Sequence, residues 1–403
     1  MTFNELGLDA PMVERLKALG LTQPTPIQAK AIPHALTGRD VLGIAQTGTG
    51  KTAAFGLPLV TALSKTGERP EPRCARGLVL APTRELASQI VNTLEGLTGH
   101  LRITLVVGGK SINAQSARLK RGTDILVATP GRLIDLIDRR AVDLGHTRFL
   151  VLDEADQMLD IGFVHALRRI APLLNKDRQT MLFSATMPKE MAALSKDYLT
   201  DAVRVEVSPP GKVADKVSHS VHFVAKEDKQ ALLIDLLDGH RSDRALVFSR
   251  TKHGAERLMK QLDRAGFAAA SIHGNKSQGQ RDRALGAFRD GTVRVLVATD
   301  VAARGIDIPG VGHVYNYDLP NVPENYVHRI GRTARAGKAG RAIAFCAADE
   351  MGQLKAIEKV LGTRVRVDGG TPWGPSPADK PKAPAKRRAR RRPRRRGASK
   401  LAA

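Results

Sequence analysis

Eight residues near the start of the chain have the composition of a loop that binds phosphate. Ala45 to Thr52 read AQTGTGKT, after the apolar run 40–45 and before a helical pattern that starts TAAF. In such a loop glycines let backbone N–H groups turn toward an anion, a lysine binds the β and γ phosphates, and the next hydroxyl binds Mg²⁺. Ala45 stands where the usual pattern has glycine, a change that a small residue tolerates. The phosphate-binding residues that the spacing predicts are Thr47, Gly48, Thr49, Gly50, Lys51 and Thr52.

A cluster of acids follows another apolar run. Phe149 to Leu152 form the run, and Asp-Glu-Ala-Asp follows at 153–156. Ligands of open parallel sheets bind at the carboxyl ends of the strands, so acids there can meet the phosphate loop. We expect Asp153 to hold Mg²⁺, through water, and Glu154 to orient or deprotonate the water that attacks the γ-phosphate. Alone, the tetrad can be an acidic turn, but its place after a strand and a phosphate loop favours the metal site.

A basic segment late in the chain can complete this chemistry. Residues 326–335 read YVHRIGRTAR, in which Arg332 and Arg335, three apart, share one face of a helix. Hydrolysis builds negative charge on the γ-phosphate, and an arginine finger that stabilises this charge contributes ~10³–10⁵ in rate. The alternative is a solvated basic helix, against which the sequence DVAARGID at 300–307 argues. His328, taken alone, is more typical of a structural histidine.

Parallel strands must bring these residues together, and the chain has the corresponding pattern. Short runs rich in Val, Leu, Ile and Ala alternate with helical patterns such as 84–97 and 132–139, which is typical of an α/β protein. The segment 208–216, SPPGKVADK, divides the runs into two sets and is typical of a linker. The tetrapeptide LVAT ends at 129 and again at 299, a hint of duplication. The predicted strands are 40–45, 77–81, 103–107, 125–129, 149–152 and 180–184, then 221–224, 245–249, 268–273, 293–299, 314–317 and 342–346.

Charge is unevenly distributed along the chain. The 403 residues carry a formal net charge of +24, and the segment 380–403 holds twelve Lys or Arg and no acid. This balance favours a polyanionic partner and binding that weakens with salt. From about residue 367 the chain is rich in Pro, Lys and Arg and poor in apolar residues, so we expect a disordered tail. We favour an electrostatic arm for RNA over a solubilising tail, because arginine suits phosphate geometry.

Composition narrows the class of protein further. Aromatic residues make up only 4%, so a grip on nucleic acid is not expected to depend mainly on base stacking. Cys74 and Cys346 have no neighbour at metal-ligand spacing, and we interpret both as structural residues of a reducing compartment. No stretch resembles a signal peptide or approaches the ~18 apolar residues that span a bilayer. We expect a cytoplasmic protein with no membrane partner.

Together, these motifs resemble those of a DEAD-box RNA helicase, in particular the bacterial RhlE type. The likeness covers roughly residues 1–350, with the motifs in family order. It implies two tandem RecA-like domains, ATP and Mg²⁺ as cofactors, and RNA-stimulated ATP hydrolysis that locally separates RNA duplexes or remodels RNA–protein complexes. It assigns Phe3 and the segment 20–28, GLTQPTPIQ, to adenine recognition, with Gln28 on the base. Asp307 is the implied ribose contact.

The resemblance also assigns roles that residue types alone leave open. It implies that Ser184 and Thr186 couple hydrolysis to strand separation and that His328 links the ATP and RNA sites. Hydroxyls, glycine N–H groups and arginines suit sugar and phosphate contacts, which carry no sequence information. The implied partners are single-stranded RNA and short duplexes, with ribosome-assembly or RNA-decay proteins. The implied RNA-binding residues are Arg84, Gly109, Thr129, Gly131, Arg132, Arg250, Gln278, Arg281 and Thr299.

The domain organisation that follows has four parts. A first RecA-like domain spans 1–207, a linker 208–217, a second domain 218–366 and the basic tail 367–403. Two other functions stay open at this stage: a DNA-directed translocase of superfamily 2, and an ATP-gated RNA clamp with little turnover. The acidic tetrad and the segment around Gln28 argue against the translocase. The joint presence of Lys51, Glu154 and Arg332 argues against the clamp.

Overall fold

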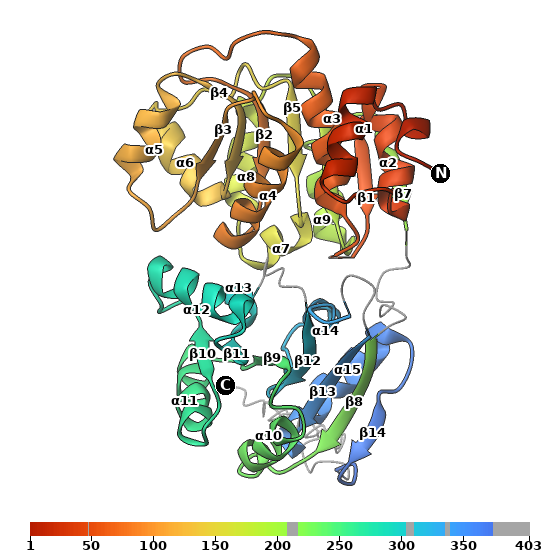
Figure 1. The fold of residues 1–403 in the computed structure, drawn as a ribbon, viewed down its shortest axis with the longest axis vertical. Coiled ribbons are helices and arrows are strands. Elements are labelled where there is room, and N and C mark those ends of the chain that lie inside the picture. Colours follow the sequence, from red (N-terminus) through yellow and green to blue (C-terminus); the bar gives the residue numbers. More distant parts are fainter. Residues whose placement is uncertain (47, 208–216, 304–309, 335–338, 374–403) are drawn as a thin grey trace, which may run out of the picture.

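The computed structural model describes residues 1–46, 48–207, 217–303, 310–334 and 339–373. They form two α/β lobes, one above the other in Figure 1. Lobe 1 is the described part up to residue 207, and lobe 2 is the described part from residue 217. Among the sequence predictions, Thr47, Asp307, Arg335, the linker at 208–216 and the tail from 374 onward lie outside the described residues.

Lobe 1 alternates helices and strands along the chain. Its helices are α1 (Ala10–Ala18), α2 (Pro26–Leu36), α3 (Lys51–Lys65), α4 (Arg84–Leu97), α5 (Ile112–Leu119), α6 (Pro130–Asp138), α7 (Ala155–Asp160), α8 (Val164–Ile170) and α9 (Lys189–Ser195), with 3-10 turns η1 (Asn4–Leu6) and η2 (Ala171–Leu173). Its strands are β1 (Val41–Ile44), β2 (Ala75–Leu80), β3 (Ile103–Val106), β4 (Thr123–Ala128), β5 (Phe149–Leu152), β6 (Gln179–Ser184) and β7 (Val203–Glu206).

Lobe 2 repeats this alternation of helices and strands. Its strands are β8 (Val217–Phe223), β9 (Arg244–Phe248), β10 (Ala269–Ile272), β11 (Val295–Ala298), β12 (Val311–Asn316), β13 (Gly340–Cys346) and β14 (Arg366–Gly369). Its helices are α10 (Lys229–Asp238), α11 (Lys252–Arg264), α12 (Gln278–Asp290), α13 (Asp300–Ala303), α14 (Glu324–Ile330) and α15 (Met351–Leu361), with the 3-10 turn η3 (Ala348–Glu350).

The described strands form one seven-stranded sheet in each lobe, and every pairing is parallel. The strand order is β3-β4-β2-β5-β6-β1-β7 in lobe 1 and β10-β11-β9-β12-β13-β8-β14 in lobe 2. The orders match position by position, with β1 equivalent to β8, β5 to β12 and β4 to β11. The two LVAT segments therefore end equivalent strands, as a duplication would place them. Two tandem parallel-sheet domains, the predicted fold class, are confirmed.

Each sheet is buried between two hydrophobic clusters, which explains the continuous apolar runs of its strands. In lobe 1, helices α1 to α4 pack on one face and α6 to α9 on the other. In lobe 2, α10 and α11 pack on one face, and α12, α14 and α15 pack on the other. Thr83 starts α4 by accepting a hydrogen bond from the Leu86 N–H at 3.2 Å, a cap that contributes ~1 kcal/mol.

The predicted strands and the structure differ mainly at the last strand of each lobe. All twelve predicted runs overlap a strand, but β7 and β14 were not predicted. Both are edge strands of four residues whose sequences, VRVE and RVDG, alternate polar and apolar residues instead of forming an apolar run. β14 pairs with β8, and the Trp373 indole N–H donates to the Cys346 carbonyl at 2.9 Å. The predicted start of the tail at 367 is therefore wrong, since folded structure extends to 373, and lobe 2 begins at 217 instead of 218.

Candidate functional site

The phosphate loop joins β1 to α3, and its geometry shows why glycines are needed. Gly48 and Gly50 have φ of 80° and 88°, in the left-handed region that favours glycine. A Cβ on Gly50 would also lie 2.5 Å from the side-chain amide nitrogen of Gln28. Lys51 begins α3, where the first N–H groups of a helix lack partners within the helix. The loop therefore presents N–H groups and a cation at one place.

Two buried ionisable side chains beside this loop have atoms without a hydrogen-bond partner. Lys51 is 6% exposed and Glu154 is 4% exposed. Within the described structure, neither the Lys51 Nζ nor the Glu154 Oε2 has a hydrogen-bond partner. Burying charged atoms without partners is costly, and native proteins rarely do so without a reason. These atoms indicate a ligand site. Lys51 would bind an anionic group of the ligand, and Glu154 would bind a polar group.

Asp153 and Glu154 follow β5 and stand beside Lys51. Burial raises the pKa of Asp153 to about 7, against the attraction of Lys51, while the Glu154 and Asp156 carboxylates add to the rise. Glu154 has a φ of 51°, uncommon outside glycine, so its backbone carries a cost of ~1 kcal/mol or more. Carboxylate and hydroxyl oxygens are ligands that Mg²⁺ prefers, so Asp153 with Thr52, in the first turn of α3, fits a Mg²⁺ site.

The predicted coupling residues lie at the end of β6 and are tied to the last acid of the tetrad. Asp156 Oδ2 accepts hydrogen bonds from the Ala185 N–H at 3.1 Å, the Thr186 N–H at 2.8 Å and the Thr186 hydroxyl at 2.9 Å. The Ser184 hydroxyl donates to the Thr186 carbonyl at 2.6 Å. Asp156 was not among the predicted site residues. Its position at the end of the acidic tetrad was the only signal in the sequence.

Gln28 has a structural task that the sequence analysis did not assign. Its Oε1 accepts from the Thr25 N–H at 3.0 Å, and its Nε2 donates to the Gly50 carbonyl at 2.9 Å. Gln28 thus joins the start of α2 to the phosphate loop, and the spacing Thr25-x-x-Gln28 is a readable capping signature. Phe3, predicted to contact adenine, is 3% exposed and packs in the hydrophobic core of lobe 1. Its contact with adenine stays a prediction.

Helix α14 of lobe 2 faces the phosphate loop of lobe 1. His328 interacts electrostatically with Glu154 and Lys51 as well as with Arg332 of its own lobe. Burial lowers the pKa of His328, the carboxylates of Asp156 and Glu154 oppose that shift, and the cations support it. Arg332 is 5% exposed, and its Nε donates to the His328 carbonyl at 3.2 Å. The structure therefore brings the predicted residues of the two lobes together.

A cavity of about 490 Å³ lies between the lobes beside these residues. Gln46, Asp156 and Thr186 line it from lobe 1, and His328 and Gly331 line it from lobe 2. His328 and the Ser-Ala-Thr segment therefore border the same space. Any change in the separation of the lobes moves these two groups relative to each other.

A second cavity, of about 380 Å³, gathers most of the predicted RNA-binding residues. Its walls include Arg84, Thr129, Gly131 and Arg132 from lobe 1 and Arg281 from lobe 2. Gly109 has a φ of 75° and lies against the guanidinium of Arg84. Burial lowers the pKa of Arg84, and the neighbouring cations Arg281 and Arg132 lower it further. Such a collection of cations is suited to phosphate groups.

The lobes are in direct contact at the edge of this second cavity. Arg281 forms an ion pair with Glu85 at 2.9 Å, in which the two side chains are 13% and 5% exposed. Gln278 accepts from the Arg84 guanidinium at 3.1 Å and donates to Glu85 at 3.3 Å. The resemblance places Glu85 in a segment of the RNA path, 82–87, but gives it no role of its own. An acid in the first turn of a helix is common for electrostatic reasons alone.

The comparison with known proteins agrees with this geometry. Residues 25–194 match the family model described as DEAD/DEAH box helicase, and residues 228–337 match the helicase conserved C-terminal domain. The DEAD-box ATP-dependent RNA helicase CshA of Bacillus cereus is 44% identical over 373 residues, which are 92% of this chain and 70% of that protein. The chain belongs to the DEAD-box ATP-dependent RNA helicases.

Solved structures of DEAD-box proteins show which arrangement of lobes this helicase resembles. S. cerevisiae Dbp5 bound to RNA and ADP BeF3 is 33% identical, with a TM-score of 0.81 over 91% of this chain and 96% of that one. The DEAD box protein of Methanococcus jannaschii is 37% identical, but its TM-score is 0.52 over 92% of this chain and 99% of that one. At similar identity, the two lobes taken together therefore superpose better on Dbp5 bound to RNA and ADP BeF3 than on the M. jannaschii protein. This DEAD-box helicase has an arrangement similar to that of Dbp5 with RNA and nucleotide.

Four predicted RNA-binding residues of this helicase do not line the second cavity. Two of them, Gly109 and Gln278, lie against Arg84, which does line it, and the other two are Arg250 and Thr299. Arg250 follows β9, and its guanidinium donates to the Glu350 carboxylate and to the Leu319 carbonyl. Thr299 follows β11, and its N–H donates to the Ile272 carbonyl at 3.3 Å. Both residues lie at the carboxyl ends of lobe 2 strands. No helix in the described part of the chain is long and apolar enough to cross a membrane.

Proposed function

We propose that this DEAD-box helicase uses RNA-stimulated ATP hydrolysis to separate short RNA duplexes locally or to remodel RNA–protein complexes. One observation carries the proposal. Lys51 and Glu154, buried in lobe 1 with atoms that lack hydrogen-bond partners, interact electrostatically with His328 from lobe 2. Completing the site therefore requires both lobes and a triphosphate.

The roles of the site residues follow from their positions. Lys51 and the N–H groups of residues 48–50 bind the β and γ phosphates, and Glu154 orients the attacking water and accepts its proton. Thr52 and Asp153 would hold Mg²⁺, which would neutralise charge on the β and γ phosphates. Arg332, with Arg335 as predicted from sequence, supplies positive charge to the γ-phosphate in the transition state.

RNA and ATP each contact both lobes, so each contributes to the free energy of closing the molecule. Each ligand then favours the binding of the other, because once RNA or ATP has closed the lobes, the second ligand binds without the free-energy cost of closure. The Glu85–Arg281 ion pair belongs to this closed arrangement. Asp156 and Thr186 line the same cavity as His328. They therefore connect changes at the ATP site to the interface between the two lobes. Hydrolysis and product release reopen the lobes.

Several finer assignments are part of the same proposal. The RhlE type is proposed from the sequence motifs, while the relative named above is a CshA. A cytoplasmic location and partners in ribosome assembly or RNA decay are likewise proposed from sequence. Preference for RNA over DNA would come from contacts with 2′-hydroxyls. RNA recognition is largely independent of sequence, because the arginines and backbone N–H groups of the second cavity suit phosphate and sugar.

Steady-state ATPase rates without nucleic acid, with RNA and with DNA test the proposal when Glu154→Gln is measured alongside. RNA should stimulate the wild-type rate and DNA should not. Glu154→Gln should keep ATP and RNA binding and lose ~10²-fold or more of the turnover, because the amide cannot take a proton from water. Glu95→Gln, an exposed carboxylate on α4, is the matched control.

Each rival function has its own outcome in this experiment. Equal stimulation by DNA would support the translocase. Slow wild-type turnover combined with very long residence on RNA would support the clamp. Normal turnover of Glu154→Gln would contradict the role of Glu154.

A further inference from the structure

The two lobes carry a buried lysine at equivalent positions. Lys51 is the first residue of α3, which follows β1, and Lys229 is the first residue of α10, which follows the equivalent strand β8. Both are buried, at 6% and 2% exposure. Lys51 Nζ has no hydrogen-bond partner in the described structure, but Lys229 Nζ is paired. Lobe 2 therefore keeps the lysine of a phosphate site although the phosphate loop is absent from its sequence.

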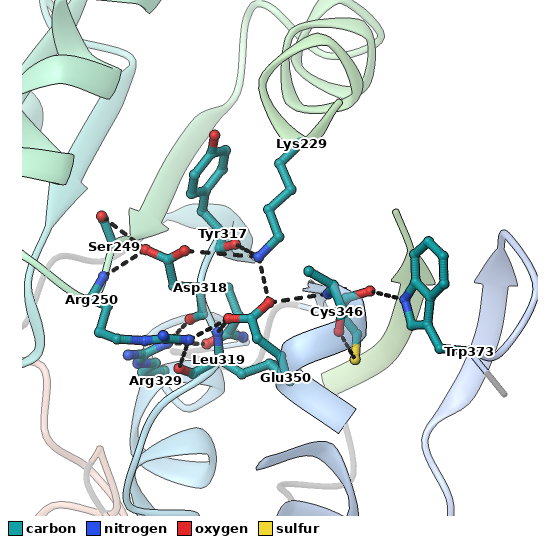
Figure 2. Close-up of polar contacts among 12 residues, drawn as sticks. Lys229, Ser249, Arg250, Tyr317, Asp318, Leu319, Arg329, Cys346, Glu350 and Trp373 are labelled. Carbon is teal, nitrogen blue, oxygen red and sulfur yellow. Dashed lines mark hydrogen bonds and ion pairs between the residues drawn. The ribbon is translucent and has the colours of Figure 1, made fainter. Parts of the chain in front are cut away.

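A carboxylate of the protein takes the place of the anion in lobe 2. Glu350 is 3% exposed, and its Oε2 accepts from Lys229 Nζ at 2.5 Å and from the Ala347 N–H at 3.1 Å. Its Oε1 accepts from the Leu319 N–H at 3.2 Å and from the Arg250 guanidinium. One lysine, one arginine and two backbone N–H groups are the kinds of donor that a phosphate site provides. Figure 2 shows these donors converging on the carboxylate from separate segments.

Asp318, the acid next to Lys229, also has its partners within lobe 2. Asp318 lies two residues after the end of β12, the strand equivalent to β5, which Asp153 of lobe 1 directly follows. Its Oδ1 lies 3.8 Å from Lys229 Nζ, and its Oδ2 accepts from the Ser249 hydroxyl at 3.1 Å and the Arg250 N–H at 2.8 Å. The backbone and the guanidinium of Arg250 are thus fixed by different carboxylates (Figure 2).

The same network reaches α14, the helix that ends just before Arg332. The Asp318 carbonyl accepts from Arg329 at 2.6 Å, and Arg329 also pairs with Asp300 at 2.5 Å and 2.7 Å. Arg329 lies in α14, next to His328. Asp318 therefore holds the backbone of Arg250 through its carboxylate and the side chain of Arg329 through its carbonyl.

We propose that Glu350 replaces a phosphate group in a phosphate site of lobe 2 that no longer binds nucleotide, and that it positions Arg250 for RNA. The proposal rests on the RNA role proposed for Arg250. Glu350 and Leu319 hold the Nη2 of Arg250, while the side chain of Arg250 is 34% exposed and can present its other nitrogens to RNA. A guanidinium already held in place loses less entropy when it binds phosphate. Glu350 lies outside both family-model matches, so the motifs do not mark it.

The test is a titration of wild type and variants with single-stranded RNA, read as ATPase rate. Glu350→Gln should raise the RNA concentration for half-maximal rate about tenfold, because a neutral amide cannot hold both cations. Its kcat at saturating RNA should stay within about twofold of wild type, since Lys51, Glu154 and Arg332 are untouched. Glu350→Asp, which keeps the charge, should recover part of the loss and serves as the test if the Gln variant does not fold.

Glu256→Gln is the matched control within lobe 2. Glu256 accepts from the Ser271 hydroxyl at 2.6 Å and pairs with Lys276 and His273, and none of these three partners contacts Glu350 or Arg250 in the described structure. Its loss should lower the unfolding temperature and leave the RNA concentration for half-maximal rate unchanged. The change from Glu350 to Gln should have no further effect in an Arg250→Ala background, because it acts through that arginine.

The outcomes separate this proposal from the proposed function. A shift for Glu350→Gln no larger than for Glu256→Gln would overturn the positioning role, and so would tighter RNA binding or a full extra effect in the Arg250→Ala background. If wild type shows no stimulation by RNA, the proposed function fails. A normal wild-type response with unaltered Glu350 variants refutes only the inference about Glu350.

Discussion

The two lobes have the same strand order but differ in whether their buried charged side chains are paired within the protein. In lobe 1, Lys51 and Glu154 keep atoms without partners, and burial raises the pKa of Asp153 to about 7. In lobe 2, the equivalent lysine, Lys229, is paired with Glu350. Leaving buried charges unpaired costs stability, so such atoms persist where a ligand completes them. A comparison of equivalent strand ends thus identifies the ligand-binding lobe without reference to any motif.

Lobe 2 contributes to the shared site through its arginines. Its carboxylates at strand ends pair with its own lysine and arginines. Arg332, by contrast, contacts His328, the residue of lobe 2 that interacts electrostatically with Lys51 and Glu154 of lobe 1. The chemistry is therefore divided, with the phosphate loop and acids in lobe 1 and the transition-state cation in lobe 2. Neither lobe alone has the complete set.

The variant Arg332→Ala is the strongest test of this division of the catalytic groups between the lobes. We expect kcat for RNA-stimulated hydrolysis to fall about 10³-fold, the lower end for an arginine finger, because Arg335 remains. ATP affinity of isolated lobe 1 cannot change, and that of the whole protein without RNA should change little. A large loss of ATP affinity without RNA would show that Arg332 supports the ground state instead. Arg204→Ala, an exposed arginine of β7, is the control.

The second prediction uses the ionisation of Asp153, the acid that follows β5 beside the phosphate loop. With a pKa of about 7, Asp153 is mainly protonated below that pH in the free protein and ionised above it. Mg²⁺ binds the ionised form, so affinity for Mg²⁺–ATP should fall as pH drops through 7. Ionised Asp153 is about one-tenth of the total one unit below the pKa, so the loss between pH 8 and pH 6 should be about tenfold.

The measurement is equilibrium binding of Mg²⁺ with a fluorescent ATP analogue at several pH values. Asp153→Asn should remove most of this pH dependence together with most of the affinity. The same binding curve for Asp318→Asn should keep its pH dependence, because Asp318 is not at the ATP site. A wild-type affinity that is flat between pH 6 and pH 8 would contradict the assignment of Asp153 as the metal-holding residue.

The third prediction concerns the contact that joins the lobes. Removing the charge of Glu85 leaves Arg281 without its partner in a poorly exposed place, at a cost of ~1 kcal/mol or more. Glu85→Gln should therefore weaken RNA binding about fivefold in the presence of a non-hydrolysable ATP analogue, since closure is required there. Without nucleotide the variant should bind RNA as wild type does. Equal weakening in both conditions would mean that Glu85 acts on RNA directly and not on closure.

The sequence predicted most of lobe 1 and the chemistry at its strand ends. Apolar runs located twelve strands because parallel strands buried on both faces leave a continuous signal. The phosphate loop and the acids after β5 have fixed spacings, and the structure brings Lys51, Asp153 and Glu154 together. The edge strands β7 and β14 were missed, because a strand with one neighbour tolerates polar residues.

Other features of the site were outside the reach of sequence reasoning for physical reasons. Glu85 and Glu350 act through partners that are 196 and 100 positions away, in Arg281 and Arg250, and no local pattern indicates such pairs. The positive φ of Glu154 also cannot be predicted from the sequence, because a glutamate does not require a positive φ. Gln28 was assigned to adenine from the resemblance, while its contact with the phosphate loop appeared only in the structure.

The smallest expected effect concerns the end of lobe 2. A chain truncated after Trp373 keeps β14 and the hydrogen bond from the Trp373 indole to the Cys346 carbonyl, whereas truncation after Asp368 removes that bond and the last residue of the strand. Loss of ~1 kcal/mol should lower the unfolding temperature of the shorter chain by about 2–4 °C. Both truncations remove the basic tail, so both should weaken RNA binding and flatten its salt dependence equally. Equal unfolding temperatures would show that residues 369–373 do not stabilise lobe 2, and unchanged RNA binding would identify the tail as a solubilising segment.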